Sequence, residues 1–250
     1  MKVAETKILI TGGGSGIGRY LVESFSRDGA RVATLEYSAE AVASWSESFP
    51  EVPCLQCDVT DPVAVESAIR RLGEDHDFSP EVLINNAGII HSEPLVNLLR
   101  RDDPRHDMES WRRTVSGNLD STFVMTRELA ALWVSRRTRG VVVSVSSISA
   151  RGNAGQSAYA AAKAGINALT VTWSKELGCF GLRFNAVAPG FFDTESTRRA
   201  VAAAKLEQIA KSVPLGRLGE LAELYSAVRF LVENDYANGI VLDLNGGLVI

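Results

Sequence analysis

Short runs of β-branched and aliphatic residues alternate with segments of helical periodicity along this chain of 250 residues. The β-rich runs cover residues 7–11, 31–36, 52–57, 82–85, 141–146, 182–187 and 240–244. Helical periodicity is clearest over residues 17–27, 62–72, 108–135, 158–177 and 221–232. Such alternation predicts parallel strands joined by right-handed crossovers. We therefore expect an α/β protein with a Rossmann-type, doubly wound parallel sheet of seven strands and helices on both faces.

The composition indicates a single globular domain and argues against nucleic-acid and membrane partners. No internal repeat, low-complexity tract or linker divides the chain, so we expect one domain over residues 1–250. The net charge of −4, with no basic block, argues against a nucleic-acid partner. No apolar stretch reaches 18 residues and the N-terminus lacks the apolar core of a signal peptide. We expect a cytoplasmic protein that has no membrane partner.

The three cysteines give no pattern typical of a disulfide framework. Cys54 and Cys57 match a two-residue spacing used by redox and zinc motifs, but they fall in an expected strand, where residues three apart face opposite sides. The chain has no second cysteine pair. A packing role is therefore favoured over metal or redox use, and we expect no metal.

A glycine-rich segment follows the first expected strand and precedes a helix. Its residues 12–18 read Gly-Gly-Gly-Ser-Gly-Ile-Gly, in which Gly12, Ser15, Gly16, Ile17 and Gly18 are the candidate phosphate contacts. Glycines let the backbone approach a pyrophosphate, and the helix N-terminus behind them offers unpaired N–H groups. The alternative is a tight strand-to-helix turn without a ligand. The position at the start of a long βαβ series favours the dinucleotide.

The residue that ends the second expected strand favours NAD(H) over NADP(H). Glu36 lies eighteen residues after Gly18, where a carboxylate accepts hydrogen bonds from ribose hydroxyls and repels a 2′-phosphate. Neither Ser15 nor Tyr37 could neutralise that phosphate, because neither is basic. Arg19 remains as a source of positive charge, and an exposed acid at a strand end is the alternative interpretation.

A tyrosine and a lysine four residues apart are the candidate catalytic pair. Tyr159 and Lys163 fall in one expected helix, where such residues share a face with Cβ atoms about 5–6 Å apart. An adjacent ammonium favours the phenolate and lowers the pKa of a tyrosine. Ser146 lies thirteen residues upstream at the end of a buried strand, where active sites of open α/β sheets are found.

Taken together, these motifs resemble the short-chain dehydrogenase/reductase family, in its compact branch with TGxxxGxG and YxxxK motifs. Asn85-Asn86-Ala87-Gly88 is similar to the family's NNAG segment, and Pro189-Gly190 to its PG turn. The resemblance implies hydride transfer between nicotinamide C4 and a ketone or secondary alcohol, with NAD(P)(H) as cofactor. It adds these cofactor contacts: Asp58, Val59, Asn86, Ala87, Gly88, Tyr159, Lys163, Pro189, Gly190, Phe192 and Thr194.

The same resemblance implies a role for each catalytic residue. Tyr159 would be the general acid/base and Ser146 would hydrogen-bond the reacting oxygen. Lys163 would lower the tyrosine pKa and hold the nicotinamide ribose, and Asn118 would complete a proton relay. Ser147 is the second choice of serine, since alternation along a strand would point it away if Ser146 faces the cofactor.

Two long connections are the expected substrate loops. Residues 89–107 and 190–216 both leave strands at the carboxyl edge, so both should overhang it. Leu95, Phe191 and Phe192 suggest an apolar wall, and Arg151 a contact to an anionic group. The charged stretch 100–107 is longer than is usual in the family. The substrate stays open among a ketoacyl thioester, a cyclic or steroid-like alcohol, a polyol and a secondary-metabolite ketone.

Two other functions compete with this interpretation. A sensor or scaffold protein could bind NAD(H) without turnover, although it would have no chemical need for Ser146, Tyr159, Lys163 and Asn118 together. Epimerase or dehydratase chemistry on a nucleotide sugar uses a similar pair, but those relatives usually carry an extra C-terminal domain. The resemblance also implies a homo-oligomer, tetramer or dimer, built through residues 108–135 and 156–178 and the C-terminal region.

Overall fold

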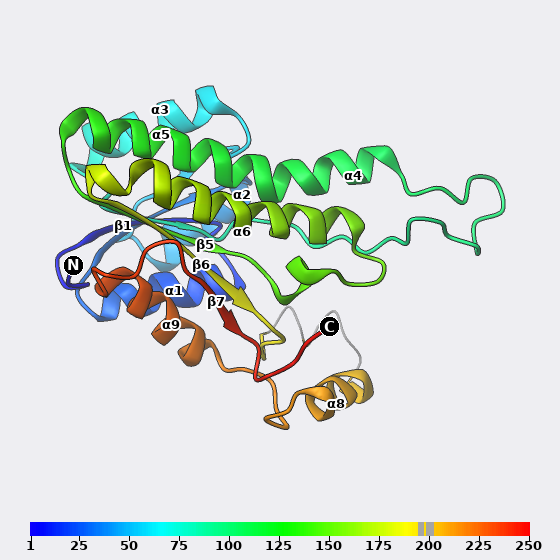
Figure 1. Cartoon of the computed structure of the whole chain (residues 1–250). Helices are drawn as coiled ribbons and strands as arrows, with labels where there is room; N and C mark the ends of the chain where they lie inside the picture. The colour runs from blue at the N-terminus through cyan, green and yellow to red at the C-terminus, as the bar shows by residue number, and fades with distance from the viewer. Residues whose placement is uncertain (195–197, 199–202) are drawn as a thin grey trace.

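A parallel sheet of seven strands lies at the centre of the protein (Figure 1). The computed structural model describes residues 1–194, 198 and 203–250. The strands are β1 (Lys7–Thr11), β2 (Arg31–Glu36), β3 (Cys54–Gln56), β4 (Val82–Asn85), β5 (Gly140–Val145), β6 (Leu182–Pro189) and β7 (Val241–Leu244). Their order, β3-β2-β1-β4-β5-β6-β7, confirms the predicted Rossmann-type sheet.

The strand order reverses between β1 and β4, which is where open α/β sheets form a ligand-binding crevice at the carboxyl ends of the strands. From β1 the chain runs outward through β2 and β3, then crosses back to β4 on the other side of β1. In open α/β sheets, ligands bind where the order reverses in this way. The segments that follow β1, β2, β4, β5 and β6 therefore all begin at one edge.

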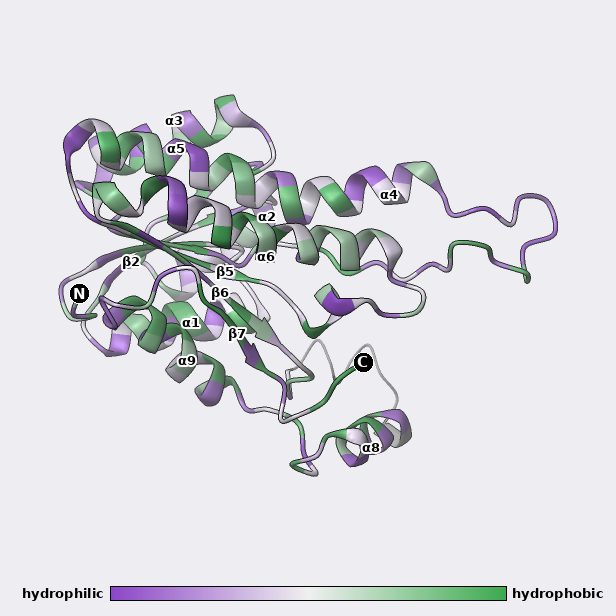
Figure 2. Ribbon diagram, viewed as in Figure 1, coloured by the Kyte–Doolittle hydropathy of each residue, from purple (hydrophilic) through white to green (hydrophobic). Residues whose placement is uncertain are grey.

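Helices cover both faces of the sheet, as the sequence predicts. The described helices are α1 (Gly16–Arg27), α2 (Ala39–Ser48), α3 (Pro62–His76), α4 (Met108–Val115), α5 (Ser121–Arg136), α6 (Ser157–Leu177), α8 (Ala203–Ser212) and α9 (Leu221–Glu233). Helices α1 and α9 pack on one face through residues such as Phe25 and Leu231. Helices α3, α5 and α6 pack on the other through Leu72, Trp133 and Trp173. In Figure 2 the central strands accordingly carry mostly hydrophobic colour.

The expected helix over residues 108–135 is interrupted. Helix α4 passes into a π-helical turn (Ser116–Asp120) before α5 begins. The side chain of Asn118 accounts for the change, because its Nδ2 donates to the carbonyl oxygens of Thr114 and Ile89, each at 2.8 Å. Single π turns inside helices are frequent at functional sites. Here the turn faces the sheet edge that carries the crevice.

Residues 89–107, called the arm below, leave β4 and project well beyond the ends of α4 and α6 (Figure 1). Val96 and Arg105 form an antiparallel bridge that joins the outgoing and returning runs. Hydrophobic colour follows one run and hydrophilic colour the other (Figure 2). The base of the arm contacts the segment before α6, since the Glu93 backbone N–H donates to the Gly155 carbonyl at 2.7 Å.

No described helix combines the length and apolar character needed to cross a bilayer.

Two helices of the structure, α2 and α8, are not expected from the periodicity of the sequence. In α2, Trp45 is the only buried residue, so the sequence has little amphipathic pattern there.

A buried arginine supports the end of α9 and yields a test of the fold. Arg183 in β6 donates hydrogen bonds to the carbonyl oxygens of Leu231, Val232 and Ala237. We expect Arg183→Met to lower the free energy of unfolding by about 3 kcal/mol, because buried acceptors would lose their charged donor. The exposed Arg31, replaced by Met as a control, should change it by less than about 1 kcal/mol. Urea denaturation that shows equal losses for both variants would contradict the role of Arg183.

Candidate active site

The glycine-rich loop between β1 and α1 has the shape of a phosphate cradle. Gly12 and Gly16 adopt positive φ angles of 67° and 53°, a region that favours glycine. A Cβ atom on Gly18 would lie 1.9 Å from the Gly12 carbonyl oxygen. Ser15 is the N-cap of α1, yet its side chain makes no capping hydrogen bond in the described structure. The first N–H groups of α1 are therefore available to an anion, which fits a dinucleotide pyrophosphate.

The carboxylate of Glu36 lies against this loop. Its Oε1 accepts a hydrogen bond from the Gly14 N–H at 2.5 Å, and Thr34 Oγ1 accepts one from the Gly13 N–H at 3.0 Å. Burial raises the pKa of Glu36, and the Gly14 hydrogen bond opposes that rise. The end of β2 thus holds both the loop and an acid at the place where an adenosine ribose would lie.

A surface hollow of about 540 Å³ adjoins Glu36, between the ends of β2 and β3. Tyr37, Gln56 and Asp58 are among its lining residues. Asp58 Oδ1 accepts hydrogen bonds from the Thr60 backbone N–H at 2.9 Å and the Thr60 hydroxyl at 2.7 Å. Asp58 therefore shapes its own turn as well as lining the hollow, and Val59 follows in the same turn.

The segment after β4 fastens the cradle to the centre of the sheet. Asn86 Nδ2 donates to the carbonyl oxygens of Thr11 at 3.1 Å and Gly12 at 2.8 Å. The Ala87 N–H donates to Thr11 Oγ1 at 3.0 Å. Gly88 comes next, and a Cβ atom there would lie 2.5 Å from Asn118 Oδ1 and 3.6 Å from Lys163 Nζ. The glycine is what lets these two side chains meet the crevice.

Tyr159 and Lys163 lie together on α6, as predicted, and both are buried. Lys163 Nζ lies 5.5 Å from the centroid of the Tyr159 ring and donates a hydrogen bond to the Val145 carbonyl at 2.8 Å. That hydrogen bond ties α6 to the carboxyl end of β5. Burial lowers the pKa of Lys163 to about 8.

The pKa of Tyr159 differs from the sequence expectation. Burial raises it above the ordinary value, and a hydrogen bond with the Ser147 side chain lowers it by less. The expectation considered only the ammonium four residues away, whereas desolvation of the phenolate dominates in the folded chain. In the protein alone, Tyr159 is therefore held as the neutral phenol.

The structure reverses the expected orientation of two serines. Ser147, expected to point away, hydrogen-bonds Tyr159 and also accepts the Ser149 N–H at 3.1 Å. Ser146 Oγ instead donates to the Lys163 carbonyl at 3.2 Å and is buried. The strand pairing continues through Ser146, whose N–H donates to the Val187 carbonyl, whereas Ser147 is the N-cap of the short helix Ile148–Arg151. The two serines therefore lie in different backbone settings, which their spacing in the sequence does not reveal.

Asn118 meets the pair from the π turn. Its Nδ2 is fully used, while its Oδ1 is buried and has no hydrogen-bond partner among the described residues. A buried acceptor without a partner is costly, so a bound water is expected to satisfy it. Gly88 lies next to both Oδ1 and Lys163 Nζ, so the unpaired acceptor and the ammonium lie on the same side of the site.

The segment after β6 closes the opposite side of the crevice. Pro189 ends β6, and a Cβ atom on Gly190 would lie 2.8 Å from the Asn245 Cα. Phe192 is buried and pairs with Gly219 in an isolated bridge. Thr194, also buried, comes directly before residues 195–197. Those residues and 199–202, which belong to the expected substrate loop 190–216, lie outside the described part of the chain.

The residues expected to contact the substrate differ in their surroundings. Leu95 is 72% exposed on the arm, so it does not pack into a wall. Arg151 forms an ion pair with Asp243 at the surface, which occupies its guanidinium. Phe191 is half-buried after the end of β6, and its carbonyl accepts a hydrogen bond from the Gly219 N–H at 2.9 Å. Its contact with a substrate stays a prediction.

Comparisons with known proteins agree with this arrangement. A model of the short chain dehydrogenase family matches residues 6–205. The 3-oxoacyl-[acyl-carrier-protein] reductase FabG of Thermotoga maritima is 34% identical over 257 residues, which cover 100% of both chains. The (3R)-3-hydroxyacyl-CoA dehydrogenase of Canis lupus familiaris is 32% identical, covering 99% of this chain and 98% of the relative.

A solved structure is similar over nearly the whole chain. The gluconate 5-dehydrogenase from Burkholderia cenocepacia J2315, in complex with NADP and tartrate, superposes with a TM-score of 0.86 at 27% identity. The match covers 99% of this chain and 96% of that chain.

The buried ammonium of Lys163 predicts how stability changes with pH. Its folded pKa of about 8 lies below the ordinary 10.5, so the unfolded chain binds more protons in this range and stability rises with pH. From pH 7 to 9 the expected gain is about 1 kcal/mol. Urea denaturation of the cofactor-free protein should show this gain relative to Lys163→Met. An identical pH response in both proteins would rule out a charged, buried Lys163.

Proposed function

The chain belongs to the short-chain dehydrogenase family, and from that premise we propose how its own residues carry out the reaction. It is a nicotinamide-dependent oxidoreductase that acts on keto and hydroxy groups. When bound, the cofactor supplies or accepts a hydride at the nicotinamide. The observation that carries the proposal is the meeting of Tyr159, Lys163, Ser147 and Asn118 at the crevice edge.

Tyr159 exchanges a proton with the reacting oxygen of the substrate. In the reductive direction its phenol donates a proton to the developing alkoxide, and in the oxidative direction the phenolate accepts it. Ser147 donates a hydrogen bond to the same oxygen, because its hydroxyl already contacts the Tyr159 hydroxyl. We therefore assign to Ser147 the role expected for Ser146.

Lys163 supplies the charge that the phenolate needs. Its pKa of about 8 leaves it mostly protonated at neutral pH, in a site from which water is largely excluded. An ammonium beside a phenolate is worth more in such a site than in water. The water expected at Asn118 Oδ1 would pass protons between Lys163 and solvent, which restores Tyr159 after each turnover.

Glu36 supports a preference for NAD(H). Its carboxylate lies at the Gly14 N–H, where a 2′-phosphate on the ribose would meet a like charge. The structural relative with bound NADP shows that the fold also accepts the phosphorylated cofactor. We propose that the charge of Glu36 decides between the two in this chain.

We propose a 3-oxoacyl or 3-hydroxyacyl thioester as the substrate. The support is the full-length similarity to the acyl-carrier-protein reductase and the acyl-CoA dehydrogenase, at 34% and 32% identity. A homo-oligomer built through α4, α5 and α6 stays part of the proposal, and light scattering tests it.

The two serines give a direct test of the catalytic assignment. We expect Ser147→Ala to lower kcat about 100-fold or more, as for loss of one donor to a developing oxyanion. Ser146→Ala is the matched control and should change kcat less than about threefold, since its hydroxyl donates to a backbone carbonyl. Ser147→Thr should restore part of the activity. If Ser146→Ala lowers kcat more than Ser147→Ala does, then Ser146, the serine predicted from its spacing to Tyr159, has the catalytic role.

The cofactor and substrate are tested in one panel. Acetoacetyl-CoA and 5-ketogluconate are offered with NADH and NADPH, and nicotinamide absorbance is followed. We expect turnover of the thioester, faster with NADH, and a roughly tenfold loss of that preference in Glu36→Gln, about 1.4 kcal/mol of removed repulsion. Unchanged preference in Glu36→Gln would exclude Glu36 as the discriminating group. Turnover of the sugar acid alone would overturn the thioester proposal.

A further inference from the structure

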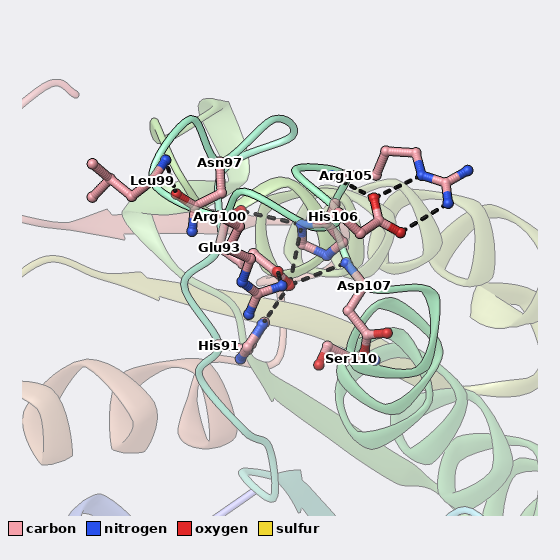
Figure 3. Close-up of polar contacts among 10 residues, drawn as sticks. His91, Glu93, Asn97, Leu99, Arg100, Arg105, His106, Asp107 and Ser110 are labelled. Atoms are coloured by element: carbon pink, nitrogen blue, oxygen red, sulfur yellow. Dashed lines mark hydrogen bonds and ion pairs between the residues drawn. The ribbon is translucent and has the colours of Figure 1, made fainter.

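Two histidines and a glutamate gather at the base of the arm, outside the catalytic cluster (Figure 3). His91 and Glu93 lie on the outgoing run, two residues apart in extended chain, so their side chains share one face. His106 comes from the returning run, where its N–H donates to the Leu95 carbonyl at 3.0 Å. The catalytic mechanism uses none of the three.

Their donor atoms are arranged around one point. His91 Nε2 lies 3.2 Å and His106 Nδ1 3.6 Å from Glu93 Oε2, and all three donor atoms fall within 4.8 Å of one another. Ligand atoms around a tetrahedral zinc ion, bound at about 2.0–2.2 Å, are separated by about 3.3 Å. The side chains need only small shifts to reach that geometry.

The charge state of the cluster also suits a cation. Glu93 is 4% exposed, shielded by the arm itself. Its carboxylate oxygens face His91, His106, the Arg100 guanidinium and the Asp107 backbone N–H, so these partners of the carboxylate are donors or cations. Only 7% of the His106 side chain is exposed, and its Nε2 has no hydrogen-bond partner among the described residues. The cluster thus contains a buried polar atom for which the arm supplies no hydrogen-bond partner.

We propose that His91, Glu93 and His106 bind one Zn²⁺ ion, with water in the fourth position. Two imidazoles and one carboxylate are a ligand set that zinc takes in proteins. His106 Nδ1 now faces the Glu93 carbonyl at 3.2 Å, so binding moves its proton to Nε2. The Trp111 ring packs edge-on beside the imidazole, with 6.3 Å between the ring centroids.

The ion would fasten the arm to the catalytic part of the chain. It joins the outgoing run to the returning run, and Glu93 is already bonded through its backbone to Gly155 and bridged to Gln156. Gln156 comes directly before α6, which carries Tyr159. The site therefore fixes the base of the arm to the N-terminal end of α6 and has no part in the chemistry itself.

Arg100 is the competing cation. Its guanidinium donates to Glu93 Oε1 at 2.7 Å, on the opposite oxygen from the two histidines. Its side chain is 52% exposed, so it can leave the carboxylate without being stranded in the protein. This predicts that Arg100→Ala binds zinc more tightly than the wild type, an effect that a purely structural cluster would not produce.

The test is Zn²⁺ binding to the chelator-stripped, full-length protein, measured by competition with a chromophoric chelator. We expect one ion per chain, a loss of affinity of about 100-fold in His91→Ala and in Glu93→Gln, and tighter binding in Arg100→Ala. His76→Ala is the matched control, since His76 is the remaining histidine of the sequence and ends α3, and it should bind as the wild type does.

Three outcomes would overturn the proposal. The first is no stoichiometric binding by the folded wild type. The second is equal binding in His91→Ala, which would mean an adventitious ion only. The third is a Co²⁺ spectrum with thiolate-to-metal charge-transfer bands, which would place the ion on the free cysteines. His91 is partly exposed, so its variant should keep the fold, and the thermal melt of the metal-free protein checks this.

Discussion

The hydrogen bond from the Lys163 ammonium to the Val145 carbonyl holds the active site together. It joins the helix that carries Tyr159 to the end of the strand that leads into Ser147, so acid and serine meet at a fixed distance. The same burial that makes this bond strong removes water from the ammonium and lowers the pKa of Lys163 to about 8. Burial of the ammonium lowers the stability of the folded chain, but it places a positive charge where the Tyr159 phenolate forms.

The fold could be predicted from the sequence because its signals are local. Short runs of β-branched residues predict buried parallel strands, and the glycine-rich turn indicates where the first crossover connection begins. The break between α4 and α5 could not be predicted from periodicity, since it depends on Asn118 reaching the carbonyl of Ile89, 29 residues away. Helix α2 was missed because a single buried residue leaves no periodic pattern.

The candidate site was predictable in its residue types and less so in its geometry. Tyr159, Lys163 and Asn118 come together as the resemblance implies. The choice between Ser146 and Ser147 stays a prediction, because spacing favours Ser146 whereas in the folded chain the Ser147 side chain is the one that hydrogen-bonds Tyr159. The cluster of His91, Glu93 and His106 could not be predicted from the sequence either, because the arm has to fold back on itself before His106 meets the other two.

The π turn at residues 116–120 has a consequence for aligning this chain with others. Such a turn holds one residue more than an α-helical turn, which rotates everything downstream by about 100° about the helix axis. The helical turns before and after residues 116–120 are therefore offset from one another by one residue. A comparison that aligns residues 108–136 with an unbroken helix needs a gap of one residue within this turn to superpose α4 and α5 together.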